Sequence, residues 1–200
     1  MNDEIMETPF DKRDCVEMER LAAGHDAALN ELMERHAGKL FHYLLRCLQN
    51  EEDAADAAQE TFMRVYQNRT KFNLQQRFST WLYAIATNLV KDRYRHRSRH
   101  PQVSLDAQTL TNSAPRENLP AEGLSPSESV QATERADLIR QAVNALPEEL
   151  QIPLILSEYE EKSHAEIGAI TKCSPKAVEM RIYRARKLLR SRLEGLLNSN

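Results

Sequence analysis

The hydrophobic pattern of the chain is helical almost throughout. Apolar residues recur every three to four positions, and no run alternates with a period of two. Three such stripes cover Leu29–Leu48, Ala58–Val65 and Phe78–Leu89. A shorter helix is predicted near Val16 to Ala23, and Gly24 marks its end. The first half of the chain therefore predicts a helical bundle.

Two polar residues in this half have expected structural roles. Asp26 precedes the longest stripe and is predicted to cap that helix, because an aspartate oxygen accepts the backbone N–H groups left without partners there. His36 lies on the apolar face of the same helix. We therefore expect a partnered core histidine there rather than a ligand.

The helical pattern stops between Ser98 and Ser127. Four prolines and one glycine fall there among polar residues, and aromatic residues are absent. Such a segment buries too little apolar surface to offset its ordering entropy, so we expect a flexible linker over 98–127. The predicted fold class is all-α, with two small helical domains over 15–97 and 128–200 on either side of that linker. An acidic N-terminal extension over 1–14 precedes them.

The formal charge of -3 conceals four blocks of alternating sign. Residues 1–60 carry 6 basic and 15 acidic side chains, and residues 61–100 carry 9 and 1. Residues 101–170 carry 4 and 12, and residues 171–200 carry 8 and 2. The two positive blocks fall in different predicted domains, so we expect each domain to present one face to a polyanion.

Composition excludes several classes of protein. No apolar run approaches the roughly 20 residues of a membrane span, and the N-terminus is acidic where a signal peptide is basic. We therefore expect a cytoplasmic protein without membrane insertion. The three cysteines, Cys15, Cys47 and Cys173, lie too far apart for a zinc motif or a disulfide framework. Five glycines leave no phosphate-binding loop, and no cofactor or metal is predicted.

The sharpest local pattern lies near the C-terminus. Ser163 followed by Glu166 is a capping box that starts one short helix, and Ser174 followed by Pro175 starts another. The second helix carries a series of basic residues: Lys176, Arg181, Arg184, Arg186, Lys187, Arg190 and Arg192. A turn of about three residues between the two helices predicts a helix-turn-helix. A basic run alone would favour a solvated surface helix, but the two helix starts favour DNA binding.

Two residues of this half depart from regular helical structure. Lys172 stands at the turn, where many such motifs use glycine to reach positive φ, so a strained or reshaped turn is expected. Pro153 removes the helical hydrogen bond to the carbonyl of Glu149 and is expected to bend its helix.

Two separate motifs resemble the extracytoplasmic-function (ECF) sigma factors of bacterial RNA polymerase, within the sigma-70 family. Leu146–Glu149 and the helix-turn-helix ending in Arg181–Arg190 are similar to region 4 of that family. In the N-terminal half, Asp53–Tyr66 is similar to region 2.2 and Phe72–Asp92 to regions 2.3 and 2.4. The resemblance implies a non-enzymatic subunit that recruits core polymerase, recognises the -10 and -35 promoter elements and helps to melt the DNA.

The resemblance also implies two contacts with polymerase. The region 2.2 helix would dock on the clamp helices of the β′ subunit, and region 4 would meet the β flap. The residues implied at the clamp are Asp53, Asp56, Gln59, Glu60 and Arg64. An exposed polar helix face is the alternative. A metal site on the two aspartates has no third carboxylate or histidine at convergent spacing.

By the same resemblance, the third stripe and the loop before it recognise and melt the -10 element. Asn88 and Asp92 are one helical turn apart, and the loop from Asn73 to Arg77 would accept a base flipped out of the non-template strand. The implied residues are Asn73, Gln75, Gln76, Arg77, Asn88, Lys91, Asp92 and Arg95. Trp81 could stack on a base, but its place beside Phe78 favours core packing.

The recognition helix would read the -35 element. The implied residues are His164, Lys176, Glu179, Met180, Arg181, Tyr183, Arg184 and Arg186. Many relatives carry lysine or arginine where this chain has Glu179, and a small hydroxyl residue where it has Met180. Because glutamate accepts a hydrogen bond from cytosine N4 and repels phosphate, we expect an altered -35 sequence.

Other functions stay open on the sequence alone. A stand-alone repressor or activator could use the same helix-turn-helix, but its sensor domain would have no reason to carry a second basic run beside Asn88 and Trp81. A helical enzyme built on Asp53 and Asp56 lacks a nucleophile, a general base and a metal set. An anti-sigma factor between the domains, as many family members have, is compatible with a flexible linker.

Overall fold

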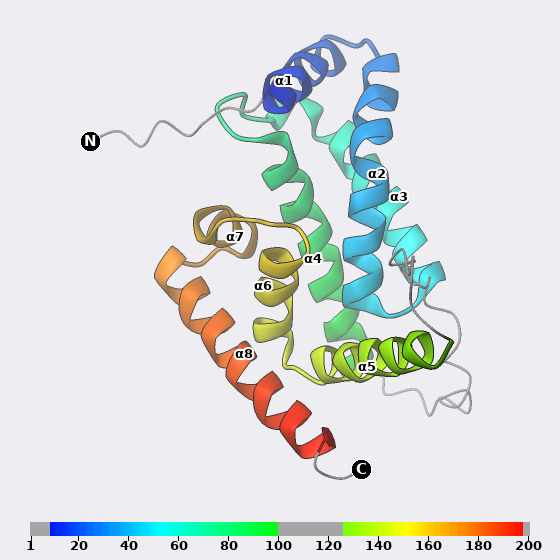
Figure 1. Cartoon of the computed structure of the whole chain (residues 1–200). Coiled ribbons are helices and arrows are strands. Elements are labelled where there is room, and N and C mark those ends of the chain that lie inside the picture. The colour runs from blue at the N-terminus through cyan, green and yellow to red at the C-terminus, as the bar shows by residue number, and fades with distance from the viewer. Residues whose placement is uncertain (1–8, 100–125, 198–200) are drawn as a thin grey trace.

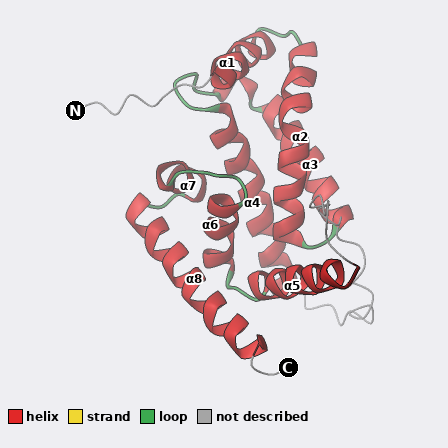
Figure 2. Cartoon of the chain, in the orientation of Figure 1, coloured by secondary structure: helices red, strands yellow, loops and turns green. Residues whose placement is uncertain are grey.

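The structure, a computed structural model, describes residues 9–99 and 126–197, and every regular element in those ranges is helical (Figure 1, Figure 2). The N-terminal half contains α1 (Pro9–Ala22), α2 (Ala27–Leu48), α3 (Glu51–Gln67), the 3-10 helix η1 (Arg69–Lys71) and α4 (Phe78–Arg99). The C-terminal half contains α5 (Pro126–Asn144), α6 (Glu148–Glu158), α7 (His164–Thr171) and α8 (Pro175–Leu197). The predicted all-α class with two helical domains is confirmed.

The N-terminal half is a bundle of α2, α3 and α4, with α1 packed across one end (Figure 1). One apolar face of each bundle helix is fully buried, as at Leu40, Val65 and Leu82. Tyr43 and Thr87 are buried in the same core, where their hydroxyl oxygens lie 2.7 Å apart. This hydrogen bond satisfies two polar groups that would otherwise be costly to bury.

The helix α1 begins earlier than predicted, at Pro9 instead of near Val16. It therefore includes Asp14, which the sequence analysis placed in the N-terminal extension. Asp14 is only 2 % exposed because Arg35 and His36 of α2 pair with its carboxylate. Hydrophobic periodicity could not reveal this part of the helix, since the residue on its buried face is charged.

The predicted turn and caps of this half are partly observed. Gly24 adopts φ +95° after α1, a conformation that favours glycine. Asp26 occupies the N-cap position of α2 but makes no side-chain capping bond, because its backbone is already helical there. The predicted linker over 98–127 lies mostly outside the described residues. At its margins, α4 continues to Arg99 and α5 begins at Pro126.

The C-terminal half contains the predicted helix-turn-helix, formed by α7 and α8. The capping box is complete: Ser163 Oγ accepts the N–H of Glu166 at 3.3 Å, and Glu166 Oε2 accepts the N–H of Ser163 at 2.9 Å. Ser174 Oγ accepts the N–H of Ala177 at 3.2 Å and so caps α8. Lys172 takes the left-handed conformation at φ 59°, which confirms the strained turn.

The two halves pack against each other, which the sequence did not predict. The helix α7 lies beside α4, and α6 contacts both α2 and α4 (Figure 1). Pro153 lies within α6 and is buried, as are Ile152 and Leu154 beside it. The hydrophobic core therefore continues from one half into the other without a gap.

Replacing Gly168 by alanine should destabilise the chain, because the new Cβ would lie 2.7 Å from the carbonyl oxygen of Cys173, a backbone atom of the turn. We expect the free energy of unfolding, measured by urea denaturation, to fall by about 1–3 kcal/mol. Gly38→Ala in α2 is the matched control, since beyond the adjoining backbone of its own helix the new Cβ would meet nothing within 4 Å. That change should raise stability by up to about 1 kcal/mol. Equal effects of the two substitutions would contradict the geometry of the turn.

Candidate protein and nucleic-acid interfaces

The outer face of α3 presents part of the residue set expected to contact polymerase. Asp56 and Gln59 are exposed there, and Met63, one turn further on, exposes 49 % of its surface. Spacings of three and four residues place these side chains on one helix face. Met63 was not among the predicted contacts, although its position one turn after Gln59 identifies it as part of that face.

The rest of that set is engaged within the chain. Asp53 faces α4, where its two carboxylate oxygens each lie 2.5 Å from a guanidinium nitrogen, one from Arg93 and one from Arg97. Glu60 and Arg64 pair with each other across one helical turn at 2.7 Å. Asp53 therefore joins α3 to α4, and it also neutralises part of the basic run that was expected to face DNA phosphates.

The loop before α4 is held at both ends by aromatic side chains. Phe72 and Phe78 flank the loop, and Trp81 packs on both, with ring centroids 5.1 and 6.3 Å away. Core packing of Trp81 is therefore confirmed. Inside the loop, Asn73 Oδ1 accepts the N–H of Gln75 at 2.9 Å. This acceptor, predicted to contact a base, here holds the turn.

The tip of this loop is exposed and partly apolar. Leu74 exposes 45 % of its surface, Gln75 is exposed beside it, and Gln76 is half-buried. Leu74 was not predicted as a contact residue, because only polar residues of the loop were expected to meet a base. At the C-terminal end of the loop, Arg77 Nη1 donates to Glu166 Oε1 of α7 at 3.2 Å.

Further along α4, the residues assigned to the -10 element differ in exposure. Asn88 and Lys91 are half-buried, whereas Asp92 and Arg95 are exposed and pair with each other at 2.9 Å. Burial raises the pKa of Glu148 in α6, and the positive charges of Lys91 and Arg95 partly offset that rise. Two residues expected at the promoter therefore act electrostatically on the C-terminal half.

A polar surface, called the seam here, joins the two halves; it consists of Arg46, Arg77, Ser79, Tyr83, Glu160, Lys162 and Glu166. Tyr83 donates to Glu160 Oε2 at 2.5 Å, and Arg46 Nη1 lies 3.6 Å from Glu160 Oε1. Lys162 Nζ donates to Ser79 Oγ at 3.2 Å. Burial raises the pKa of Glu160, whose side chain is 6 % exposed, against the opposing effects of Tyr83 and Arg46.

The exposed face of α8 carries most of the residues assigned to the -35 element. Met180 and Tyr183 expose 41 % and 62 % of their surfaces, unusual values for large side chains. Lys176, Glu179 and Arg184 are also exposed on α8, and His164 is exposed at the start of α7. Lys187, one turn beyond Tyr183 and Arg184, is exposed too and was missing from the predicted set.

Three contacts modify this picture of α8. Lys176 Nζ donates to Glu179 Oε2 at 2.8 Å, and this bond lowers the pKa of Glu179. Arg181 lies toward the turn, with Nη1 3.5 Å from Cys173 Sγ. Arg186 pairs with Glu158 of α6 at 2.6 Å. Arg181 and Arg186 therefore flank the exposed face, and Glu179 meets a cation before any base reaches it.

Neither a metal centre nor a membrane segment emerges from the described residues. Within 9–99 and 126–197, no group of three or more His, Cys, Asp or Glu side chains is placed to hold a metal ion. No helix in these ranges is long and apolar enough to cross a bilayer.

Comparison with known proteins identifies the family. Profiles of Sigma-70 region 2 and of Sigma-70, region 4 match residues 32–100 and 136–189. The ECF RNA polymerase sigma factor SigW of Bacillus subtilis is 33% identical over 181 residues, which cover 90% of this chain and 96% of SigW. The chain belongs to the sigma-70 family as an ECF sigma factor. The ECF sigma-E factor of Escherichia coli K12 is 28% identical over 188 residues, 92% of this chain and 96% of that protein.

This ECF sigma factor directs promoter-specific initiation of transcription. Sigma factors bind core RNA polymerase and promoter DNA and are not enzymes, so the enzyme and the stand-alone regulator are excluded. The N-terminal half corresponds to region 2 and the C-terminal half to region 4. The helix α1 precedes the residues that the region 2 profile matches.

Solved structures share the fold of this sigma factor. CnrH, solved in complex with the cytosolic domain of CnrY, superposes with a TM-score of 0.65 at 23% identity, covering 92% of this chain and 98% of CnrH. RpoE of Bartonella quintana, solved in complex with the anti-sigma factor NepR, gives a TM-score of 0.63 at 19% identity, covering 82% and 96%. At these identities the likeness concerns the fold alone.

The charge of Glu166 should stabilise this sigma factor at neutral pH. Burial would raise the pKa of Glu166, but hydrogen bonds from Ser163 and the charges of Lys162 and Arg77 outweigh burial and lower it. A lowered pKa means that the ionised form stabilises the fold above the ordinary pKa of a glutamate and ceases to do so as the pH falls through the folded-state value. Glu166→Gln, which keeps the cap, should lower the free energy of unfolding by about 1 kcal/mol at pH 7.

Urea denaturation at about pH 7 and about pH 3.5 would measure this effect, and the difference between wild type and variant should be smaller at the lower pH. The control is Glu179→Gln, which removes an exposed ion pair and should leave stability unchanged. A difference that persists undiminished in acid would contradict the assigned role of the charge.

Proposed function

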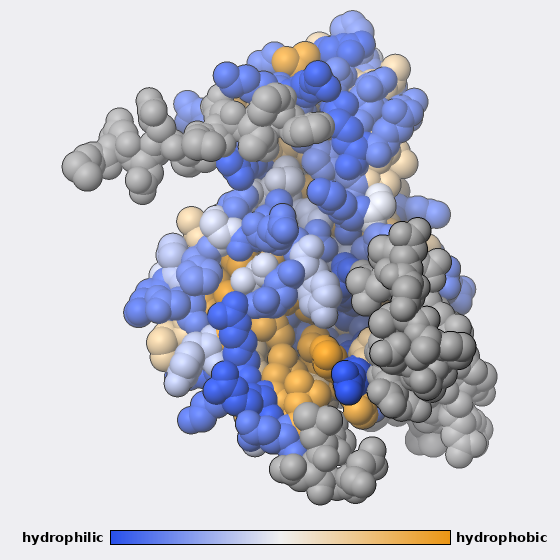
Figure 3. All heavy atoms as spheres, in the orientation of Figure 1, coloured by the Kyte–Doolittle hydropathy of each residue, from blue (hydrophilic) through white to orange (hydrophobic). Residues whose placement is uncertain are grey.

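We propose that this sigma factor acts in the cytoplasm by docking α3 on the β′ clamp helices and region 4 on the β flap. Asp56 and Gln59, with Met63 one turn beyond them, offer the clamp a polar face with an apolar side chain at one end. For the flap we propose the apolar band between α5 and α8 that is visible in Figure 3. The same two helices also expose the large apolar side chains Ile139 and Leu188. A sigma factor without catalytic groups needs both contacts to place its DNA-binding faces.

Promoter reading at -35 is assigned to α8, and the observation that carries this assignment is its exposed mixed face. Val178, Ile182 and Ala185 bury the opposite side of the helix, so the face with Lys176 and Tyr183 points outward. In the major groove, arginine and lysine hold phosphates or guanine, and apolar groups contact the thymine methyl. Glu179 would accept a hydrogen bond from cytosine N4 once Lys176 turns to a phosphate.

Promoter reading and melting at -10 are assigned to α4 and its preceding loop. Asn88 is the proposed reader of a base edge, and the exposed loop tip with Leu74 and Gln75 is the proposed platform for a flipped base. Apolar contact with the face of a base and amide hydrogen bonds to its edge are the interactions that such pockets use. Arg77 would then exchange Glu166 of region 4 for a phosphate, and Arg95 would exchange Asp92 of its own helix. Lys91 would add a further phosphate contact.

The same assignment makes the packed arrangement a resting state of the free chain. Arg77 at the -10 loop is bonded to Glu166, and α4 lies beside α7, so the seam competes with DNA for the same surface. We propose that core polymerase separates regions 2 and 4. The free chain therefore binds DNA weakly, in proportion to the fraction of molecules that are open.

An anti-sigma factor is the proposed partner of the resting state. The two solved structures above were determined as complexes, and the Bartonella quintana sigma factor in one of them is bound to an anti-sigma factor. A protein that covers the seam of this chain would lengthen the lifetime of the packed arrangement. Purification from cells that yields only polymerase subunits under inactive conditions would argue against such a partner.

The proposed function is tested by run-off transcription. Holoenzyme reconstituted with bacterial core polymerase selects binding sites from random DNA, and a recovered site becomes the template. Initiation from that site is expected with the sigma factor and not with core polymerase alone. Equal transcription in the two reactions would overturn the proposal.

Changing Glu179 to lysine should change the selected -35 sequence at one position. The glutamate side chain accepts a hydrogen bond from cytosine N4, whereas a lysine side chain can only donate one. The -10 sequence should stay the same, since α8 does not contribute to it. Sequencing of the selected pools measures both. If wild type and variant return the same -35 motif, Glu179 does not read a base.

Replacing Glu160 by alanine should strengthen binding of the free chain to core polymerase. The change leaves the hydroxyl of Tyr83 without its acceptor inside the seam and removes the partner of Arg46, so more molecules are open. We expect the dissociation constant, measured by fluorescence anisotropy, to fall about fivefold or more. Glu158→Ala, which breaks an exposed pair at the end of α6, is the control and should change nothing. Weaker binding by the Glu160 variant would contradict competition between seam and polymerase.

A further inference from the structure

A buried acidic residue of α1 lies outside both segments that match the sigma-70 profiles. Asp14 is 2 % exposed, and the region 2 match begins only at residue 32. A carboxylate buried on one face of a surface helix costs free energy unless charged or hydrogen-bonding partners meet it. Nothing in the proposed contacts with polymerase or promoter requires this residue.

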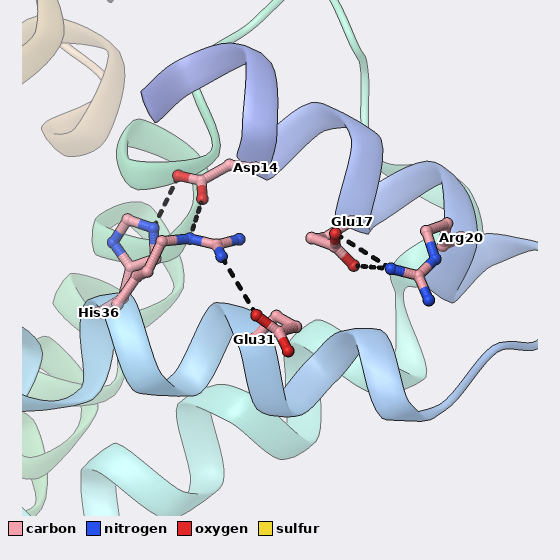
Figure 4. Close-up of polar contacts among 6 residues, drawn as sticks. Asp14, Glu17, Arg20, Glu31 and His36 are labelled. Atoms are coloured by element: carbon pink, nitrogen blue, oxygen red, sulfur yellow. Dashed lines mark hydrogen bonds and ion pairs between the residues drawn. The ribbon is translucent and has the colours of Figure 1, made fainter. Parts of the chain in front are cut away.

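The partners of Asp14 come from two successive residues of α2. Arg35 Nε donates to Oδ1 at 2.9 Å, and His36 Nε2 donates to Oδ2 at 2.7 Å, as Figure 4 shows for the carboxylate and the ring. Arg35 Nη1 also lies 3.7 Å from Oε2 of Glu31, which is one helical turn earlier. Each carboxylate oxygen thus has one donor, and the ring of His36 is fixed in one orientation.

The ring of His36 connects the Asp14 carboxylate to the residues that support the -10 loop. Its centroid lies 5.1 Å from that of Phe78 in an edge-to-face contact, and Phe78 is the first residue of α4. Phe78 in turn contacts Phe72, which precedes the loop, with centroids 6.1 Å apart. Both ends of the loop therefore rest on the aromatic cluster that His36 supports.

A second contact runs from the neighbour of Asp14 to the loop itself. Cys15 Sγ lies 3.7 Å from the carbonyl oxygen of Leu74, the apolar residue at the exposed tip. The same helix that Asp14 fixes to α2 thus also touches the backbone of the loop. Movement of α1 would shift the loop tip and the aromatic base together.

We infer that Asp14 is a positioning residue for the -10 loop: by fixing His36 against Phe78 and α1 against Leu74, it holds the loop ready for a flipped base. The inference rests on the proposed role of the loop in melting. It assigns to α1 a function in promoter opening that involves no contact with DNA. Because preorganisation sets the fraction of competent molecules, its loss weakens binding of the single strand rather than of the -35 duplex.

The test uses the full chain in holoenzyme with two probes taken from the selected promoter, a single-stranded -10 oligonucleotide and a duplex that carries only the -35 element. Asp14→Asn should weaken binding to the single strand about tenfold and leave duplex binding within about twofold. Glu17→Gln is the matched control, because it removes a carboxylate of the same helix whose ion pair, with Arg20, lies within α1 (Figure 4). It should change neither affinity.

A second readout uses the full chain without polymerase and needs no DNA. Trp81 is the single tryptophan of the chain and packs on the loop base, so acrylamide quenching of its fluorescence reports that base directly. Quenching should increase in Asp14→Asn and stay unchanged in Glu17→Gln, at a temperature where circular dichroism shows every variant folded.

His36→Gln keeps a donor for Asp14 but removes the ring from Phe78, and it covers the case in which the Asp14 variant does not fold. It should reproduce the loss of single-strand binding. Parallel losses at -10 and -35, or unchanged quenching and single-strand affinity in both variants, would overturn the inference. If the wild-type protein still supports promoter-dependent transcription, such a result would overturn only the role of Asp14 and leave the proposed function intact.

Discussion

The packed arrangement of this sigma factor depends on the contacts of the Glu160 carboxylate with Tyr83 and Arg46. Glu160 stands between regions 2 and 4 with its side chain 6 % exposed, and burial of an ionised group is costly unless partners surround it. Tyr83 and Arg46, both from region 2, supply those partners. Separating the regions would return Glu160 to water, whereas closing them places it among groups that region 2 alone can provide. This polar group therefore makes the packing of the two regions specific, and α6 and α7 supply most of the contact surface.

Much of the architecture follows from local pattern. The helices, the Gly24 turn, the Ser163 and Ser174 caps and the left-handed Lys172 are determined by residues within a few positions of each other, and the structure confirms them. The start of α1 and the missing cap at Asp26 could not be predicted, because each depends on contacts with distant residues or on the backbone of neighbouring turns.

The interface residues also divide into those that local sequence could identify and those that depend on distant contacts. The resemblance selected Asp56 and Gln59, and Glu179 with Met180, and the structure shows that all four side chains are exposed. Neither the resemblance nor helical spacing could show that Asp53 neutralises Arg93 and Arg97, since those residues are forty or more positions away. Charge counted along the sequence overestimates the charge available to DNA wherever the fold pairs cations internally. The apolar residues Met63 and Leu74 were missed for a related reason: the expected chemistry was polar.

The most direct test of the central claim is energy transfer between dyes at Lys39 and Glu161, which line the same cleft between the two regions. The dyes can be attached through unnatural amino acids, so the native cysteines stay in place. Because the two regions pack together in the free chain, energy transfer should be high there and should drop markedly when core polymerase is added. Low transfer in the free chain, or transfer that polymerase does not change, would contradict that claim.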